Sequence, residues 1–144
     1  MPDDPEKTAR RSAEIMLGRD AASRGLGIEL EEVGPGRAVL SMRVRDDMVN
    51  GYGLCHGGLM ASLADSAFAV ACNSYGEITV AAGFDVTFLE SGKAGDLLRA
   101  CAVERARRGR SGLYDVTVTR DSDGVVVAEF RGRSRSLGRP IDGS

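Results

Sequence analysis

The chain has 144 residues and a mass of 15.2 kDa, which fits a single domain. Hydrophobic residues make up 42% of it and the net charge is -2, so a disordered chain is excluded. The longest apolar stretch, 59–72, contains Asp65 and is shorter than the roughly 20 residues that a transmembrane helix needs. The first residues lack the basic-then-apolar order of a signal peptide, so we expect a cytoplasmic location.

The cysteine and histidine content argues against metal and disulfide chemistry. Cys55, Cys72 and Cys101 are an odd number without C-x-x-C spacing, which predicts reduced thiols rather than a disulfide framework or a zinc site. His56 is the single histidine, so no site can draw two imidazoles from one chain. These residues predict no metal site, and no cofactor is expected either.

Positive charge is concentrated in the C-terminal third. Residues 99–139 contain 10 Arg and 5 acidic residues in a protein that is otherwise acidic. This pattern favours an anionic small molecule as the partner, and a solvated arginine-rich sheet edge is the alternative. A nucleic-acid partner is not expected, because Trp is absent and aromatic residues make up only 5%.

The elements expected in chain order are a helix, two strands, a second helix and four strands. Residues 1–24 form an N-terminal helical segment, and residues 25–138 form one domain followed by a flexible tail, 139–144. The first two strands, 28–33 and 37–45, flank a Gly-Pro-Gly turn. The last four are expected at 78–90, 96–107, 112–121 and 125–137, and their short connections predict antiparallel hairpins.

The segment 58–73 is apolar nearly all round, rich in Ala and Leu and free of Pro. It predicts a buried helix about 24 Å long. Six strands wrapping this helix make an α+β architecture. Ser62, Asp65 and Ser66 form one narrow polar strip on it.

Asp65 is the only charge in this helix. Because burial of an unpaired carboxylate is costly, Asp65 must meet either a polar cavity or an internal partner such as Ser62 or a backbone N–H. We favour a functional carboxylate.

Gly57 and Gly58 stand at the expected start of the same helix. Their free N–H groups and the positive end of the helix dipole suit an oxyanion or a polarised carbonyl. Tight packing of the glycines against a strand is the alternative. Gly57 and Asp65 are about 12 Å apart along one helix, too far to act on one carbonyl. If both act, a two-fold related chain must supply one of them, and the site lies at a dimer interface.

The run H-G-G-x(4)-L-A-D-x-A-F-A-x-A-C-N-S, preceded by Asn50-Gly51, resembles the hotdog-fold acyl-CoA thioesterases, most closely those of the phenylacetate-degradation (PaaI) type. The segments V80-A-A-G-F-D-V-T-F-L-E-S-G, G112-L-Y-D-V and F130-R-G-R-S-R agree with it. The resemblance covers residues 14–138. It implies hydrolysis of an aryl-CoA thioester, such as phenylacetyl- or hydroxyphenylacetyl-CoA, in a tetramer built from two dimers.

The resemblance also implies roles for single residues. Asp65 matches the catalytic carboxylate, as general base or nucleophile, and Gly57, with Gly58 beside it, matches the donor to the thioester carbonyl. Asn50 matches a side chain that orients water or the leaving group, and His56 one that helps to bind near the thioester.

Two further features follow from the same comparison. Many relatives carry a Ser or Thr early in the next strand as a partner of the acid, where this chain has Ala81 and Ala82, with Thr79 as the nearby hydroxyl. The basic surface that holds coenzyme A phosphates matches six residues: Arg107, Arg108, Arg110, Ser111, Arg131 and Arg133.

Other readings of the same residues are ranked lower. A Cys55–His56 nucleophile is rejected, because neighbouring side chains diverge and no third orienting residue is evident. A hotdog enoyl-CoA hydratase and a non-catalytic acyl-CoA binding module remain alternatives. Retention of Asp65 argues against plain binding.

Overall fold

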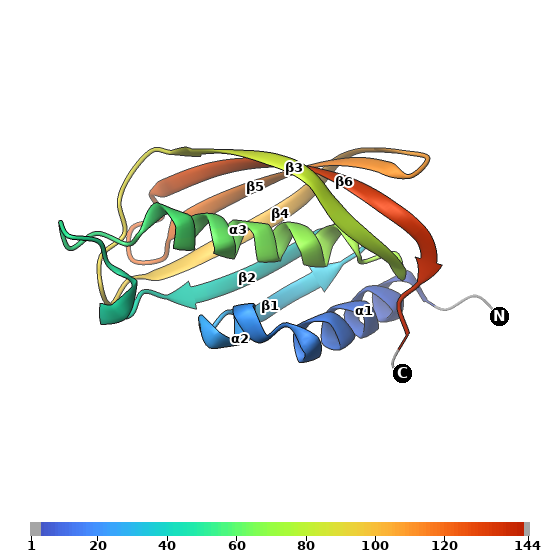
Figure 1. Ribbon diagram of the computed structural model, residues 1–144, viewed down its shortest axis with the longest axis horizontal. Helices are drawn as coiled ribbons and strands as arrows, with labels where there is room; N and C mark the ends of the chain where they lie inside the picture. Colours follow the sequence, from blue (N-terminus) through green and yellow to red (C-terminus); the bar gives the residue numbers. More distant parts are fainter. Residues whose placement is uncertain (1–3, 143–144) are drawn as a thin grey trace.

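The computed structural model describes residues 4–142 and shows one six-stranded sheet wrapped around a central helix (Figure 1). The chain runs through α1 (Pro5–Arg19), α2 (Ala21–Gly25), β1 (Glu29–Gly34), β2 (Arg37–Arg43), a 3-10 turn (Asp46–Met48), α3 (Gly57–Cys72), β3 (Glu77–Phe88), β4 (Leu97–Arg108), β5 (Ser111–Arg120) and β6 (Val126–Pro140). The predicted order of helices and strands is confirmed. The N-terminal segment is two helices rather than one, because Asp20 ends α1 and its carboxylate caps α2.

All strand pairs are antiparallel, in the order β1-β2-β4-β5-β6-β3. A curved antiparallel sheet around one long buried helix is the hotdog fold. The predicted hairpins β4–β5 and β5–β6 are confirmed, but the prediction of a β3–β4 hairpin is wrong. β2 pairs with β4 along its length, so β3 takes the far edge beside β6. The segment 89–96 then crosses the end of the sheet.

The core lies between α3 and the concave face of the sheet. Alternate residues of β2 and β5 face inward, as their period of two predicts, and Leu40, Met42, Val116 and Val118 are fully buried. On α3, Phe68 packs against the rings of Tyr114 and Phe130. Gly132 on β6 leaves room for Phe68, since a Cβ there would lie 2.8 Å from its ring.

β3 is an edge strand with a partly uncovered apolar face. Phe84 and Phe88 are 41% and 47% exposed, and Val80 and Leu89 are exposed as well. Edge strands present unpaired backbone groups to any second strand, and an apolar edge favours such pairing. This edge is therefore a candidate surface for association with another chain.

The start of α1 and the end of β6 lie near each other, at the end of the molecule where α3 finishes (Figure 1). β6 continues to Pro140, and the Ile141 N–H donates to the Gly76 carbonyl at 2.8 Å. Part of the segment expected as a flexible tail is thus ordered, while residues 143–144, like residues 1–3 of the expected helical segment, lie outside the described residues. Within residues 4–142, no helix is long and apolar enough to cross a membrane.

Candidate active site

The start of α3 is capped by a histidine. His56 has an extended backbone (φ -59, ψ 128), and its Nδ1 accepts a hydrogen bond from the Gly58 N–H at 3.1 Å. This bond requires Nδ1 to be unprotonated, which leaves Nε2 as the protonated nitrogen of the neutral ring. The His56 carbonyl accepts from the Leu59 N–H at 2.9 Å.

Gly57 is the first residue of the helix, and its N–H differs in hydrogen bonding from the N–H groups of the next two residues. Within residues 4–142 no hydrogen-bond acceptor is found for it, whereas the Gly58 and Leu59 N–H groups are both engaged. The structure thus distinguishes the Gly57 N–H from the Gly58 N–H, which the sequence alone could not. Gly57 offers a free N–H at the positive end of the helix dipole, and Gly58 does not.

An aromatic ring covers Gly57. A Cβ on Gly57 would lie 3.0 Å from Cζ of Phe88, so glycine is needed here for close packing as well. The functional and the packing explanations of this glycine are therefore compatible. Phe88 comes from the exposed edge strand and was not singled out from the sequence. Phe84, Val86 and Phe88 occupy every second position of the strand, and this spacing shows only that the three side chains share one face.

Asn50 organises the loop that precedes α3. Its Oδ1 accepts from the Tyr52 N–H at 2.9 Å and the Leu54 N–H at 3.2 Å, and its own N–H donates to the Leu54 carbonyl at 2.7 Å. The His56 N–H donates to the Met48 carbonyl at 2.8 Å, which holds the other end of the loop. The carbonyl oxygen of the Asn50 side chain is thus engaged, whereas its amide nitrogen has no acceptor among residues 4–142 and can donate to a ligand.

Asp65 lies two turns into α3 and is half-buried. Burial raises its pKa, and the charge of Asp20 raises it further. Among the described residues its carboxylate has no hydrogen-bond or ion-pair partner. Ser62, the partner considered from the sequence, instead donates to the Gly58 carbonyl at 2.8 Å. The alternative of a satisfied internal aspartate is therefore not supported.

A hydrogen-bonded chain connects α2 to α3 beside this carboxylate. Asp20 accepts from the Ser23 hydroxyl at 2.6 Å, and the Ser23 and Ser66 hydroxyls are 2.8 Å apart. Ser66, the neighbour of Asp65, is thereby occupied and cannot orient it. These hydrogen bonds also hold the Asp20 carboxylate close enough for its charge to raise the pKa of Asp65. Sequence reasoning missed Asp20, because 45 positions separate the two acids and no local pattern links them.

The hydroxyl near the start of β3 does not serve Asp65 within this chain. The Thr79 hydroxyl donates to the Glu77 carbonyl at 3.1 Å, and the Thr79 backbone binds the Asn73 side chain beyond the end of α3. Ala81 and Ala82 are both exposed and carry no polar group. The acid at position 65 thus has no hydroxyl orienting it from β3 of its own chain.

The Cys55 thiol is unsuited to nucleophilic attack. Cys55 is buried (6% exposed), and burial together with the charge of Asp96 raises its pKa. Only the thiolate is a strong nucleophile, so a raised pKa argues against this role. Within residues 4–142, no group of three His, Cys, Asp or Glu side chains is arranged to hold a metal ion.

The arginines expected to bind phosphate divide into two groups. Arg131 forms a bidentate ion pair with Asp115 (2.7 and 2.9 Å), and Arg133 pairs with Asp85 at 3.0 Å. Arg107 lies over the ring of Tyr75, with its guanidinium carbon 3.5 Å from the ring centroid. These three side chains already have partners.

Arg108, together with the already paired Arg133, lines a shallow depression of about 380 Å³ on the sheet near the β4–β5 turn, whereas Arg110 does not. Its rim includes Arg108, Ser111, Arg133 and Arg135, and its floor is made of small or apolar residues such as Leu113. No ion pair within the described part of the chain involves Arg108, Arg110 or Arg135. Arg135 was missed from the sequence, although it continues the period-two spacing of Arg131 and Arg133.

Residues 52–127 match the thioesterase superfamily. The chain belongs to this family. The Escherichia coli acyl-coenzyme A thioesterase PaaI is 42% identical over 94% of this chain and 96% of its own length. The solved structure of E. coli PaaI, described as part of the phenylacetic acid degradation operon, superposes with a TM-score of 0.93 at 40% identity, covering 96% of this chain and all of that one. A Streptococcus mutans protein solved with acetyl CoA is 25% identical, with a TM-score of 0.75 over 79% of this chain and 91% of that one. The family and the fold implied by the sequence resemblance are confirmed, and the chain is a thioester hydrolase.

Proposed function

We propose that this enzyme hydrolyses aryl-CoA thioesters, of the phenylacetyl or hydroxyphenylacetyl type, to the free acid and coenzyme A in phenylacetate catabolism. Two groups of α3 carry the proposal, the Gly57 N–H and the Asp65 carboxylate, neither of which has a hydrogen-bond partner among residues 4–142. The E. coli relative is a named acyl-CoA thioesterase from a phenylacetic acid degradation operon, which supports this substrate class.

In the proposed mechanism the thioester carbonyl oxygen accepts the Gly57 N–H, and the helix dipole stabilises the negative charge that develops on it. Asp65 removes a proton from an attacking water, or attacks the carbonyl carbon itself and is then released by water. Either route breaks the C–S bond, and the coenzyme A sulfur takes up a proton as it leaves. The Asn50 amide nitrogen and the His56 Nε2–H are donors near the same carbonyl. No metal or cofactor takes part.

The site needs two chains. The eight residues from Gly57 to Asp65 span about 12 Å of helix, beyond the reach of one carbonyl carbon. We propose that β3 edges of two copies pair, so that two α3 helices lie antiparallel and each Gly57 faces the partner's Asp65. The exposed Phe84 and Phe88 of β3 support this interface. Two such dimers form the tetramer.

The acyl group and the nucleotide contact different parts of the surface. Phe88 packs against Gly57, so an aryl group whose carbonyl is bound there would meet an aromatic ring. The phosphates of coenzyme A bind Arg108 and Ser111, joined by Arg135, at the depression beside the β4–β5 turn, together with Arg110 in that turn. The S. mutans relative solved with acetyl CoA supports a coenzyme A ligand for this fold.

Release of free thiol from a panel of aryl- and alkyl-CoA thioesters, followed with a thiol reagent, tests the function. We expect the enzyme to turn over phenylacetyl-CoA with a higher kcat/KM than hexanoyl-CoA, and Asp65→Asn to lose nearly all of this turnover. An enoyl-CoA hydratase would consume an enoyl-CoA without releasing thiol. A binding module would bind acyl-CoA and release none.

A mixed dimer tests the shared site. One chain carries Asp65→Asn and the other Gly57→Pro, each with its own tag, and the heterodimer is isolated after co-refolding. One of its two sites then receives both lesions and the other neither, so about half of the wild-type activity per dimer should return. A folded heterodimer as inactive as either parent would show that both groups act within one chain.

A further inference from the structure

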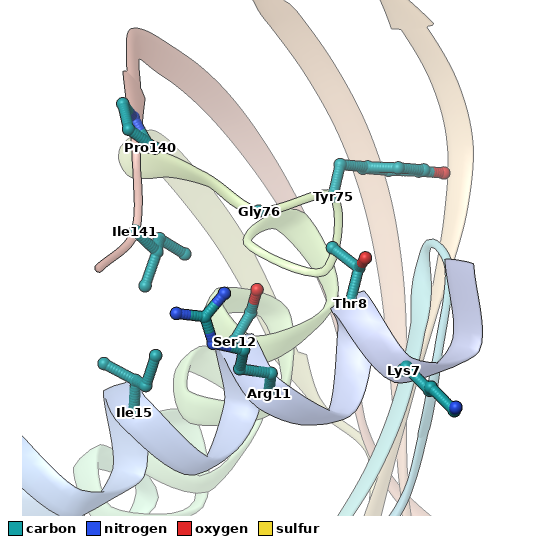
Figure 2. A pocket seen from close by; sticks show the side chains of 9 residues that line it. All are labelled: Lys7, Thr8, Arg11, Ser12, Ile15, Tyr75, Gly76, Pro140 and Ile141. Atoms are coloured by element: carbon teal, nitrogen blue, oxygen red, sulfur yellow. The ribbon is translucent and has the colours of Figure 1, made fainter. Parts of the chain in front are cut away.

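A cavity of about 510 Å³ lies at the other end of α3 from Gly57 (Figure 2). The side chains of α1 form one wall, and the turn after α3 and the end of β6 form the other. Nine residues line it: Lys7, Thr8, Arg11, Ser12, Ile15, Tyr75, Gly76, Pro140 and Ile141. The length of α3, about 24 Å, separates this cavity from the free N–H of Gly57.

Hydrogen bonds and close contacts hold the walls in place. The Ile141 N–H donates to the Gly76 carbonyl at 2.8 Å, and Arg19 of α1 donates to the Asp142 carbonyl at 3.0 Å. Gly76 has a left-handed backbone (φ 88), and a Cβ there would lie 3.2 Å from Thr8. The cavity is therefore built into the fold of the chain.

The α1 wall presents hydrogen-bond donors that lack acceptors. Ser12 is only 4% exposed, and none of the described residues forms a hydrogen bond with its hydroxyl. Every fully buried side-chain oxygen or nitrogen within residues 4–142 has a hydrogen-bond partner, so the Ser12 hydroxyl is open to the cavity that it lines, where it can donate to a ligand or to solvent. The Arg11 guanidinium lies on the same side as the Ser12 hydroxyl, facing Gly76 and Ile141 (Figure 2), and no described residue forms an ion pair with it.

The charge of the lining is entirely positive. Arg11 and Lys7 are the ionised groups among the nine residues, and none of the nine is a carboxylate. A planar guanidinium beside the Ser12 hydroxyl matches the oxygens of an anion, whereas Thr8 turns its methyl group toward Gly76 (Figure 2). The charge of the lining therefore suits an anionic group.

The other half of the lining is apolar. Ile15, Pro140 and Ile141 offer only hydrocarbon, and the Tyr75 hydroxyl donates away from the cavity to Glu104 at 2.9 Å. An inorganic anion would leave this surface unused. We propose that the cavity is a binding site for a small organic carboxylate, with its carboxylate on Arg11 and Ser12 and its aryl or alkyl body against the two isoleucines. The volume fits such a molecule.

The proposal rests on the proposed function only in the choice of probe, because the acid released by thioester hydrolysis belongs to this chemical class. The test therefore measures binding rather than turnover. Phenylacetate is titrated into the uniformly 15N-labelled and methyl-labelled protein, and shifts are followed at Gly76, Ile15 and Ile141 for this cavity and at Gly57 for the candidate active site. Inorganic phosphate and neutral phenylacetamide are titrated in parallel.

We expect saturable shifts at Gly76 and both isoleucines with phenylacetate, and much weaker effects of phosphate and phenylacetamide. Arg11→Gln should weaken this binding about tenfold or more and Ser12→Ala severalfold. Arg10→Gln, an exposed neighbour outside the cavity, is the matched control and should leave it unchanged. The thermal melt of each variant checks its fold.

Three results would overturn the proposal. Shifts confined to Gly57 would place the acid in the active site alone. Phosphate binding as tight as phenylacetate would show an inorganic-anion site, and equal weakening by Arg10→Gln would show non-specific attraction to a basic helix. Each can occur whether or not the protein cleaves acyl-CoA, so failure here is separate from failure of the proposed function.

Discussion

The free N–H of Gly57 can be deleted with little change to the backbone. Gly57 is the first residue of α3, where proline is well tolerated, and it has no positive φ. His56 before it has ψ 128, the extended value that a residue preceding proline adopts. The N–H lost in Gly57→Pro has no acceptor among the described residues, so no internal hydrogen bond is broken.

A matched control separates the loss of the N–H from the added side chain. Both proline and alanine place a Cβ 3.0 Å from Cζ of Phe88. Gly57→Ala thus carries the same steric change and keeps the donor. Loss of one oxyanion donor costs about 10²–10³ in kcat, so we expect Gly57→Pro to be slower than Gly57→Ala by about that factor.

The assay is thiol release from the best acyl-CoA substrate under saturation, with melting temperatures of both variants to confirm folding. Gly57→Ala should stay within a few-fold of the wild type. If folded Gly57→Pro and Gly57→Ala have equal kcat, the Gly57 N–H does not stabilise the transition state, and the carbonyl must be bound elsewhere.

Other expected outcomes concern the charges. Asp65→Asn should reduce kcat by at least about 10²-fold. It should also raise the melting temperature at pH 7, because the folded state no longer ionises a half-buried carboxylate whose pKa is raised. This gain in melting temperature should vanish below the unfolded pKa of about 3.8, and a lower melting temperature at pH 7 would contradict the reasoning. Asp20→Asn keeps an N-cap side chain but removes a charge that raises the pKa of Asp65, so the acidic limb of the pH–rate profile should move to lower pH; an unmoved limb would show that Asp20 does not act on the base. Arg108→Ala with Arg110→Ala should raise KM at low salt and leave kcat unchanged, whereas Arg131→Gln should alter KM little because that side chain is committed to Asp115; equal effects would argue against the assignment of the phosphate site.

Local patterns predicted the elements of this fold and which faces they bury. Apolar residues at every second position, such as Leu40 and Met42 in β2 and Val116 and Val118 in β5, identify the strands and their inward faces, because successive side chains point to opposite faces of a strand. The apolar composition of α3 likewise identifies a buried helix. The place of β3 in the sheet could not be predicted this way, since its alternation is equally compatible with β4 or β6 as neighbour.

The candidate site shows the same division between local and distant information. Gly57, His56 and Asp65 lie on one helix or directly before it, so a sequence motif finds them. The pairing of Arg131 with Asp115 depends on the register between β5 and β6, and it removes one arginine from the predicted phosphate site. The effect of Asp20 on Asp65 depends on how α2 packs against α3.

Dimer formation through β3 would resolve two features of the single chain, its exposed aromatic rings and the distance between Gly57 and Asp65. The edge strand β3 exposes Phe84 and Phe88 to solvent. Covering these two rings with another chain would stabilise the protein. The free Gly57 N–H and the unpartnered Asp65 carboxylate are too far apart in one chain to serve one carbonyl. Antiparallel pairing of two β3 edges would cover the rings and bring each N–H opposite a carboxylate, so the same contact that stabilises the dimer completes its sites. Stability and activity should therefore be lost together when β3 pairing is blocked.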